Sequence, residues 1–379
     1  MNPLNTIPLI QALFIFYFYV RPLHKVPAIV KTLFVVILIA VTFNSYLYIF
    51  TKFTIADFGF PKWSLMIIES LFYMNVFLSI FVFVKILLNT LYKFIARDFS
   101  KSLIPSESVI YAGVVFFLSL YIGCLGVSNG FSAPINHYYD IKVENLSNSA
   151  NGFKIVQLSD LHINKVTTKS EIREIVQRVN DIHADLVVIT GDFVDGKVEQ
   201  LNDITNILFE LKSQYGTYAV SGNHEMYSGY KEWLDYFEKG GIKFLENSSV
   251  IISDYNSNHL INLCGVIDPK GSRYDLPKTD VKSAILNIDK DLPIVFLSHR
   301  PNYGIDLRNI ADLTLTGHTH GGMMIGFDKI IGIQNEGMTS GLYDLGRERV
   351  IVSNGTRINA AVPFRIGNPS EINIITLHQ

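Results

Sequence analysis

The chain has 379 residues, a formal net charge of −2 and two cysteines. Its length exceeds what one hydrophobic core usually supports, which favours two structural units. The near-neutral charge and the absence of a long basic run argue against nucleic acid as the main partner. Cys124 lies in an apolar run and Cys264 in a more polar region, so the cysteines do not indicate a redox compartment.

Residues 1–127 contain long apolar runs with few charges. A hydrocarbon core about 30 Å thick needs roughly 20 apolar helical residues. Four runs meet or approach this length and predict about four transmembrane helices, at Leu4–Val20, Thr32–Phe50, Ser64–Leu88 and Ser108–Val127. Successive runs without a polar face disfavour the alternative of buried helices in a large soluble core. The first run is the shortest of the four. The runs show no repeated polar series of the kind that a transport path needs, so the helices are interpreted as an anchor.

The basic residues of the connecting loops predict how these helices are oriented. Lysine and arginine are enriched in cytoplasmic loops. The first loop holds Arg21, Lys25 and Lys31, the third holds Lys93, Arg97 and Lys101, and the second holds only Lys52 and Lys62. The first and third loops are therefore expected in the cytoplasm. The fourth helix then leads outward, and the rest of the chain is expected on the extracytoplasmic side.

From residue 128 onward the chain has the mixed polarity of a soluble domain. Residues 128–150 are predicted to form a linker and a leading strand, and residues 151–379 a single α/β domain. Buried strands are predicted at Lys154–Leu158, Leu186–Thr190, Thr217–Val220, Ile261–Val266, Ile294–Leu297 and Leu313–Thr316. Helices are predicted at Ser170–His183, Asp203–Lys212 and Gly229–Lys239, the first with a capping box between Thr168 and Glu171.

Polar residues that can bind metals or move protons follow these predicted strands. They are Asp160 and His162, Asp192, Asn223 with His224 and Glu225, His299, and His318 with His320. In α/β sheets, ligands gather beyond the carboxyl ends of the strands. Each short pattern alone is weak, because a Gly-Asp pair after a strand usually makes a turn and a single histidine is often a core residue. Together they predict a metal site.

The ordered set DLH, GDF, GNHE, SH and GHTH resembles the signature of the calcineurin-like metallophosphoesterases, over roughly Phe153–Leu377. The SDLH start and the GHTHGG block are most similar to a bacterial membrane-associated branch that includes phosphodiesterases and UDP-diacylglucosamine pyrophosphatases. The resemblance implies an α/β fold: a four-layer αββα sandwich with two mixed sheets. It also implies a multi-pass protein of the bacterial cytoplasmic membrane.

The resemblance further implies two metal ions bridged by one carboxylate. The first ion would be held by Asp160, His162, Asp192 and His320, and the second by Asp192, Asn223, His299 and His318. Oxygen and nitrogen ligands without thiolate suit manganese, iron or zinc, with manganese favoured. His224 resembles the catalytic histidine of the family, and Glu225 could orient it. Arg300 could bind substrate phosphate, or it could form a surface salt bridge.

The expected function is hydrolysis of a phosphodiester, phosphomonoester or pyrophosphate by a metal-activated water, on an envelope lipid or a lipid-linked substrate. Met323 and Met324 suggest an apolar rim at the mouth of the site, although core packing explains methionines equally well. Two alternatives stay open: a non-catalytic metal-binding scaffold, or a regulatory module attached to a transporter or sensor. The substrate, the metal in the cell and the oligomeric state are not predicted.

Overall fold

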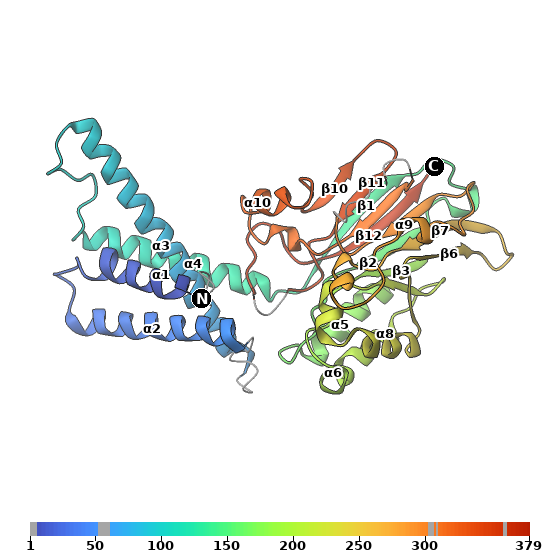
Figure 1. Ribbon diagram of the computed structural model, residues 1–379, viewed down its shortest axis with the longest axis horizontal. Helices are drawn as coiled ribbons and strands as arrows, with labels where there is room; N and C mark the ends of the chain where they lie inside the picture. Colours follow the sequence, from blue (N-terminus) through green and yellow to red (C-terminus); the bar gives the residue numbers. More distant parts are fainter. Residues whose placement is uncertain (1–5, 52–60, 302–306, 308–309, 359–361) are drawn as a thin grey trace. The chain divides into compact units, whose positions relative to one another are not determined.

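The computed structural model describes residues 6–51, 61–301, 307, 310–358 and 362–379. The chain divides into two compact units, Met1–Ser128 and Asn129–Gln379 (Figure 1). The expected start of the first span, Leu4, and the loop residue Lys52 lie outside the described residues.

The first unit is helical. It contains α1 (Ile7–Ile15), which continues as a short π-helix (Phe16–Val20), α2 (Ala28–Thr51), α3 (Lys62–Ala96) and all but the last two residues of α4 (Val109–Gly130). Among the described residues, three helices are long and apolar enough to cross a membrane, at Ala28–Leu47, Lys62–Ala96 and Val109–Gly130. The described part of the first predicted span is a shorter apolar helix, Ile7–Val20. The structure therefore has three candidate spans where the sequence predicted about four.

Close backbone approach and tyrosine hydrogen bonds hold the helices of this unit together. The Tyr19 hydroxyl donates to the carbonyl of Ala112 at 2.9 Å, and the Tyr111 hydroxyl donates to the carbonyl of Phe81 at 2.8 Å. A Cβ added at Gly123 would lie only 2.5 Å from the Ser70 carbonyl oxygen, so α3 and α4 touch at this glycine. Small residues at helix contacts are typical of membrane bundles, where lipid supplies little hydrophobic driving force between helices.

The second unit is built on two six-stranded mixed sheets. The first has the order β1 (Ile135–Lys142), β12 (Glu371–His378), β2 (Lys154–Leu158), β3 (Leu186–Thr190), β4 (Thr217–Val220) and β5 (Ile242–Phe244). The second has the order β10 (Gly341–Asp344), β11 (Arg349–Val352), β9 (Leu313–Thr316), β8 (Ile294–Leu297), β7 (His259–Gly265) and β6 (Ser248–Ser253). The strands β2, β3 and β4 are parallel to one another, as are β7, β8 and β9.

The two sheets pack face to face around one core. Ile155 and Val188 of the first sheet share a buried cluster with Leu263, Leu297 and Leu315 of the second. The helices α5 (Lys169–Asp181), α6 (Val198–Thr205) and α8 (Tyr230–Lys239) pack a second cluster onto the first sheet, and α9 (Val281–Ala284) contributes to a cluster with β7 and β8. Helices therefore cover both outer faces, which is the four-layer αββα sandwich that the sequence predicted.

The helix predicted at Asp203–Lys212 is wrong in its position. The α-helix starts five residues earlier, at Val198, and tightens into a 3₁₀-helix over Asn206–Glu210. Gln200 accepts a hydrogen bond from the backbone N–H of Lys197, which marks the helix start. The tighter turn places Leu208 fully in the core. The capping box of α5, with Thr168 and Glu171, is present as predicted.

Candidate metal centre

The carboxyl ends of five strands, drawn from both sheets, converge on one site. In the first sheet, Asp160 and His162 follow β2, Asp192 follows β3, and α7 (Asn223–Ser228) follows β4. The strands β8 and β9 of the second sheet are followed by His299 and by His318 with His320. All the predicted ligand residues except Asn223 belong to groups of side chains whose ligand atoms lie within 4.8 Å of one another.

The backbone at these strand ends is held in an unusual conformation. Asp160, His162, Asp192, His318 and His320 all have positive φ angles, between 42° and 70°. Residues with side chains rarely adopt this region, and clusters of them mark functional sites. The glycine before Asp192 is needed for a related reason: at Gly191 an added Cβ would lie 2.6 Å from the His299 ring and 2.7 Å from the Gly222 nitrogen.

The first group of ligand atoms consists of Asp160, His162 and His320. The Nε2 atoms of His162 and His320 lie 3.1 Å apart, and Asp160 Oδ1 lies 3.5 Å from His320 Nε2. Asp160 Oδ1 is buried and has no hydrogen-bond partner in the described part of the chain. Ligands about 2.1 Å from one metal ion lie roughly 3 to 3.5 Å from each other. A cation bound here would satisfy the orphaned carboxylate oxygen.

The second group consists of Asp192, His299 and His318. Asp192 Oδ2 lies 3.3 Å from His299 Nε2, which in turn lies 3.2 Å from His318 Nδ1. The Nδ1–H of His299 donates to the carbonyl of Thr190 at 2.8 Å, so its Nε2 carries the lone pair that a metal needs. Asp192 Oδ2 is also only 3.7 Å from His162 Nε2 of the first group. One carboxylate oxygen therefore reaches both groups, and the donor set fits two divalent cations.

His224 stands beside this centre and is held by Asp195. The Nδ1–H of His224 donates to Asp195 Oδ1 at 2.5 Å, and the Nδ1–H of His162 donates to Asp195 Oδ2 at 3.1 Å. The Nε2 of His224 lies 3.9 Å from Asp192 Oδ2, and a quarter of its side chain is exposed. Burial alone would raise the pKa of Asp195, but His162 and His224 hold it below its ordinary value. Burial alone would lower the pKa of His224, and Asp192 with Asp195 raises it to about 9.

The structure gives Glu225 a different role from the one expected from the sequence. Its buried carboxylate accepts hydrogen bonds from the backbone N–H groups of Asp192, Phe193 and Gly222, at 3.0, 2.7 and 2.7 Å. It thereby holds the loop that carries Asp192, while Asp195 orients the His224 ring. Sequence reasoning missed Asp195, although the spacing in GDFVD places it three residues after Asp192.

Arg300 is not part of an isolated surface salt bridge. Its Nε donates to the fully buried carboxylate of Asp268 at 2.6 Å. Its Nη2 donates to Asn223 Oδ1 at 2.7 Å, and its Nη1 lies 2.7 Å from His318 Nε2. These bonds place the guanidinium and Asn223 next to the second ligand group. Its expected contact with substrate phosphate stays a prediction.

The comparisons with known proteins agree with this geometry. The family model described as calcineurin-like phosphoesterase matches residues 153–322. A transmembrane protein with metallophosphoesterase domain from Danio rerio is 29% identical over 368 residues, covering 95% of this chain and 83% of the relative. A metallophosphoesterase of Campylobacter jejuni is 30% identical over 298 residues, covering 78% and 75%. The UDP-2,3-diacylglucosamine pyrophosphatase LpxG of Chlamydia muridarum is 24% identical over 283 residues, covering 59% and 83%.

The chain therefore belongs to the calcineurin-like metallophosphoesterases. It is a metal-dependent phosphoric ester hydrolase with apolar, candidate membrane-spanning helices at its N-terminus. Its relatives include proteins of animals as well as bacteria.

Proposed function

We propose that the enzyme uses two divalent metal ions to hydrolyse a phosphodiester, phosphomonoester or pyrophosphate bond in an envelope lipid or a lipid-linked substrate. The observation that carries the two-metal proposal is the position of Asp192 Oδ2, within 3.3 Å of His299 and 3.7 Å of His162. Two cations this close repel each other unless an anionic group lies between them. Asp192 supplies that group.

Each ligand residue has a role in this proposal. Asp160, His162, Asp192 and His320 hold the first ion, and Asp192, Asn223, His299 and His318 hold the second. When bound, the ions lower the pKa of a bound water and neutralise phosphate oxygens. The oxygen and nitrogen donors suit manganese, iron or zinc, and of these we propose manganese. His224 stabilises the charge that develops on the phosphate or protonates the leaving oxygen.

Two further side chains position these groups. Asp195 accepts the Nδ1 protons of both His162 and His224, so it fixes the nitrogen that each ring presents to the site. Arg300 is held beside the second ligand group by Asp268 and has a quarter of its side chain exposed. We propose that its guanidinium also contacts the substrate phosphate.

The lipid-linked substrate is supported by where the enzyme is attached and by one relative. Three candidate membrane spans precede the catalytic unit, which confines the enzyme to a bilayer surface. LpxG, whose name gives UDP-2,3-diacylglucosamine as its substrate, covers 59% of this chain. We propose that the chain belongs to a bacterial membrane-associated branch of the family, with its catalytic unit outside the cytoplasm. Membership of this branch accounts for both observations. The basic first and third loops support this orientation.

The substrate proposal is tested on the full chain in lipid nanodiscs with manganese. The substrates are bis-nitrophenyl phosphate, nitrophenyl phosphate and a diacylated UDP-sugar. We expect metal-dependent release of product from the diester and faster release, at matched concentration, from the diacylated UDP-sugar. Hydrolysis of the water-soluble esters alone would contradict the lipid substrate. Metal binding without turnover of any of the three would favour the non-catalytic scaffold.

The orientation is tested separately. In a Cys124→Ser background, Tyr255→Cys places a thiol on a side chain that is 86% exposed in the catalytic unit. A membrane-impermeant maleimide added to intact cells labels this thiol if the unit is outside the cytoplasm. Labelling only after the cells are lysed would reverse the orientation.

A further inference from the structure

A group of exposed apolar side chains follows the last metal-ligand loop. Ile325, Phe327, Ile330 and Ile333 have 67, 38, 56 and 81% of their surface exposed. They lie within nine residues, on and just before the short helix α10 (Asp328–Ile333). Contiguous exposed apolar groups on a soluble surface mark sites of interaction with proteins, ligands or membranes. These four residues are called the apolar rim below.

The apolar rim is attached directly to the metal centre. His320 begins a 3₁₀ turn that ends at Gly322. A Cβ added at Gly322 would lie 2.3 Å from the Cα of Asp328, so the first residue of α10 packs on the backbone two residues after His320. The side chain of Asp328 accepts a hydrogen bond from the N–H of Gly326 at 2.6 Å and closes the turn between them. The rim is therefore carried on the turn that follows the ligand His320 and packs on its backbone.

One short segment, residues 363–367, contacts both the apolar rim and Gly130 near the start of the catalytic unit. Helix α4 ends at Gly130, where an added Cβ would lie 2.7 Å from the Pro363 carbonyl oxygen. At the other end of the segment, the N–H of Ile366 donates to Met323 at 2.9 Å, and the N–H of Ile325 donates to Ile366 at 3.1 Å. The same segment thus contacts both Gly130 and the rim, all within the catalytic unit.

Arg365 makes this segment rigid. It is 1% exposed, and its guanidinium donates to the carbonyls of His320 at 3.1 Å and Asn368 at 3.0 Å, as well as to those of Asn354 and Arg357. Burial lowers the pKa of Arg365 to about 10, so it stays charged near neutral pH. Four carbonyl groups from different turns are thereby tied to one cation.

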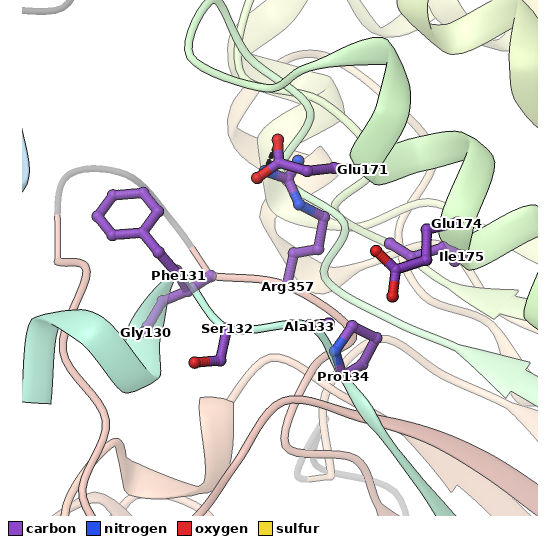
Figure 2. A pocket seen from close by; sticks show the side chains of 10 residues that line it. Gly130, Phe131, Ser132, Ala133, Pro134, Glu171, Glu174, Ile175 and Arg357 are labelled. Carbon is purple, nitrogen blue, oxygen red and sulfur yellow. Dashed lines mark ion pairs between the residues drawn. The ribbon is translucent and has the colours of Figure 1, made fainter. Parts of the chain in front are cut away.

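The chain that leaves α4 is packed as firmly. Figure 2 shows Gly130–Pro134 passing beside Arg357, which forms an ion pair with Glu171 of α5 at 3.6 Å; these residues line a cavity of about 150 Å³. Arg357 donates to Thr167 at 2.7 Å, and Arg178 of α5 donates to the carbonyl of Pro134. These contacts, all within the catalytic unit, hold residues Gly130–Pro134 at its start.

We propose that the apolar rim inserts into the interfacial layer of the bilayer that the N-terminal helices cross. The insertion places the mouth of the metal centre at the membrane surface, so that the phosphate of a lipid-linked substrate reaches the centre while its acyl chains stay in the bilayer. Exposed apolar side chains with a cation beside them are typical of interfacial segments, and Lys329 is exposed between Phe327 and Ile330. The role in substrate delivery rests on the proposed lipid-linked substrate, whereas the insertion itself does not.

The insertion is tested by fluorescence quenching from lipid in nanodiscs. The full chain carries Cys124→Ser, and the remaining Cys264 is fully buried. A nitrobenzoxadiazole label is placed on Ile333→Cys or, as a control, on Leu286→Cys. The original side chains, Ile333 and Leu286, are 81 and 77% exposed in the same unit. Doxyl-labelled phosphatidylcholine is expected to quench the label at 333 severalfold more than the label at 286. Equal quenching at both positions would overturn the proposal.

Substrate delivery is tested with Ile330→Asn/Ile333→Asn, which changes two exposed side chains, and with Leu286→Asn as the control. The ratio of the rate on the diacylated UDP-sugar to the rate on bis-nitrophenyl phosphate is expected to fall about 10-fold in the rim variant, because one or two apolar anchors contribute roughly this much. An unchanged ratio would overturn the delivery role. If the wild type does not hydrolyse the lipid substrate at all, the proposed substrate fails, while the quenching result still decides the insertion.

Discussion

The two units of this chain differ in where their polar and apolar side chains lie. In the helical unit, Leu65 and Leu78 are fully buried, while Ile110 and Phe43 are 83 and 69% exposed. Apolar side chains therefore occupy both the interior and the surface of this unit. In the catalytic unit the polar side chains that matter gather at one edge of two sheets, and the unusual surface feature is apolar. The comparison indicates that the helical unit serves membrane attachment and that the catalytic unit holds the groups needed for hydrolysis. A change in the first unit should affect attachment, and a change at the strand ends should affect turnover.

The strongest test of this separation is Asp192→Ala. The variant removes the one carboxylate oxygen that reaches both ligand groups, so we expect both ions to be lost or weakened and turnover to fall roughly a thousandfold or more. Metal content by mass spectrometry and hydrolysis of bis-nitrophenyl phosphate measure the two effects. Asp203→Ala, which alters a carboxylate that is 80% exposed, is the matched control and should behave as wild type. A fully metallated, active Asp192→Ala enzyme would refute the shared-ligand role.

A smaller effect is expected for Asp195→Asn. The amide can accept a hydrogen bond from only one side, so His162 and His224 lose their common acceptor. Losses of such outer groups cost about 10- to 100-fold in metal affinity or activity. The pH profile should change as well, because Asp195 helps to raise the pKa of His224. If Asp195 were only structural, the Asp195→Asn variant would have a lower melting temperature, and the pH profile of its remaining activity would match that of the wild type.

A change in stability with a smaller effect on turnover is expected for Arg365→Met. It removes a cation that donates to four carbonyl groups, among them the buried carbonyl of Asn354, and should lower the free energy of unfolding of the catalytic unit by about 3 kcal/mol. Turnover should fall only a few fold, since none of the ligand side chains is removed. Thermal unfolding in detergent measures the loss. Arg349→Met, whose partner Asp344 has a side chain that is 64% exposed, should cost less than about 1 kcal/mol. Similar losses for both variants would contradict this account of the segment.

The smallest effect on turnover is expected for a change in the helical unit. Gly123→Leu puts a side chain against the Ser70 carbonyl and should destabilise the bundle by about 1–3 kcal/mol. Turnover of a water-soluble ester per folded molecule should not change. Gly113→Leu on the same helix is the control, because an added Cβ there meets nothing within 4 Å. A loss of turnover specific to Gly123→Leu would break the separation and favour a regulatory role for the helices.

Much of the catalytic unit follows from local patterns in the sequence. The strands around Ile155, Val188 and Val295 are short, apolar and β-branched, and their limits could be placed to the residue because polar ligand residues follow them directly. The ligand side chains were therefore predictable as a group. The start of α6 was not, because Lys197 is an unusual residue at a helix start.

Contacts between distant loops explain what sequence reasoning missed. The choice of Asp195 over Glu225 as the partner of His224 depends on how the turns after β3 and β4 meet. Arg300 donates to Asp268, which lies 32 residues earlier in the chain, and no local sequence pattern indicates this pair. The sequence suggested an apolar rim at Met323 and Met324, but both are half-buried, and the exposed apolar side chains begin at Ile325.

The central claim is that two metal ions and His224 carry the chemistry. The most direct measurement is the metal content of the purified full chain together with its hydrolysis of bis-nitrophenyl phosphate, with and without manganese, for wild type and His224→Ala. We predict about two ions per chain in both proteins. Hydrolysis should require metal in the wild type and fall about 10²- to 10⁴-fold in the variant. Full activity of His224→Ala, or metal binding without turnover in the wild type, would contradict the account.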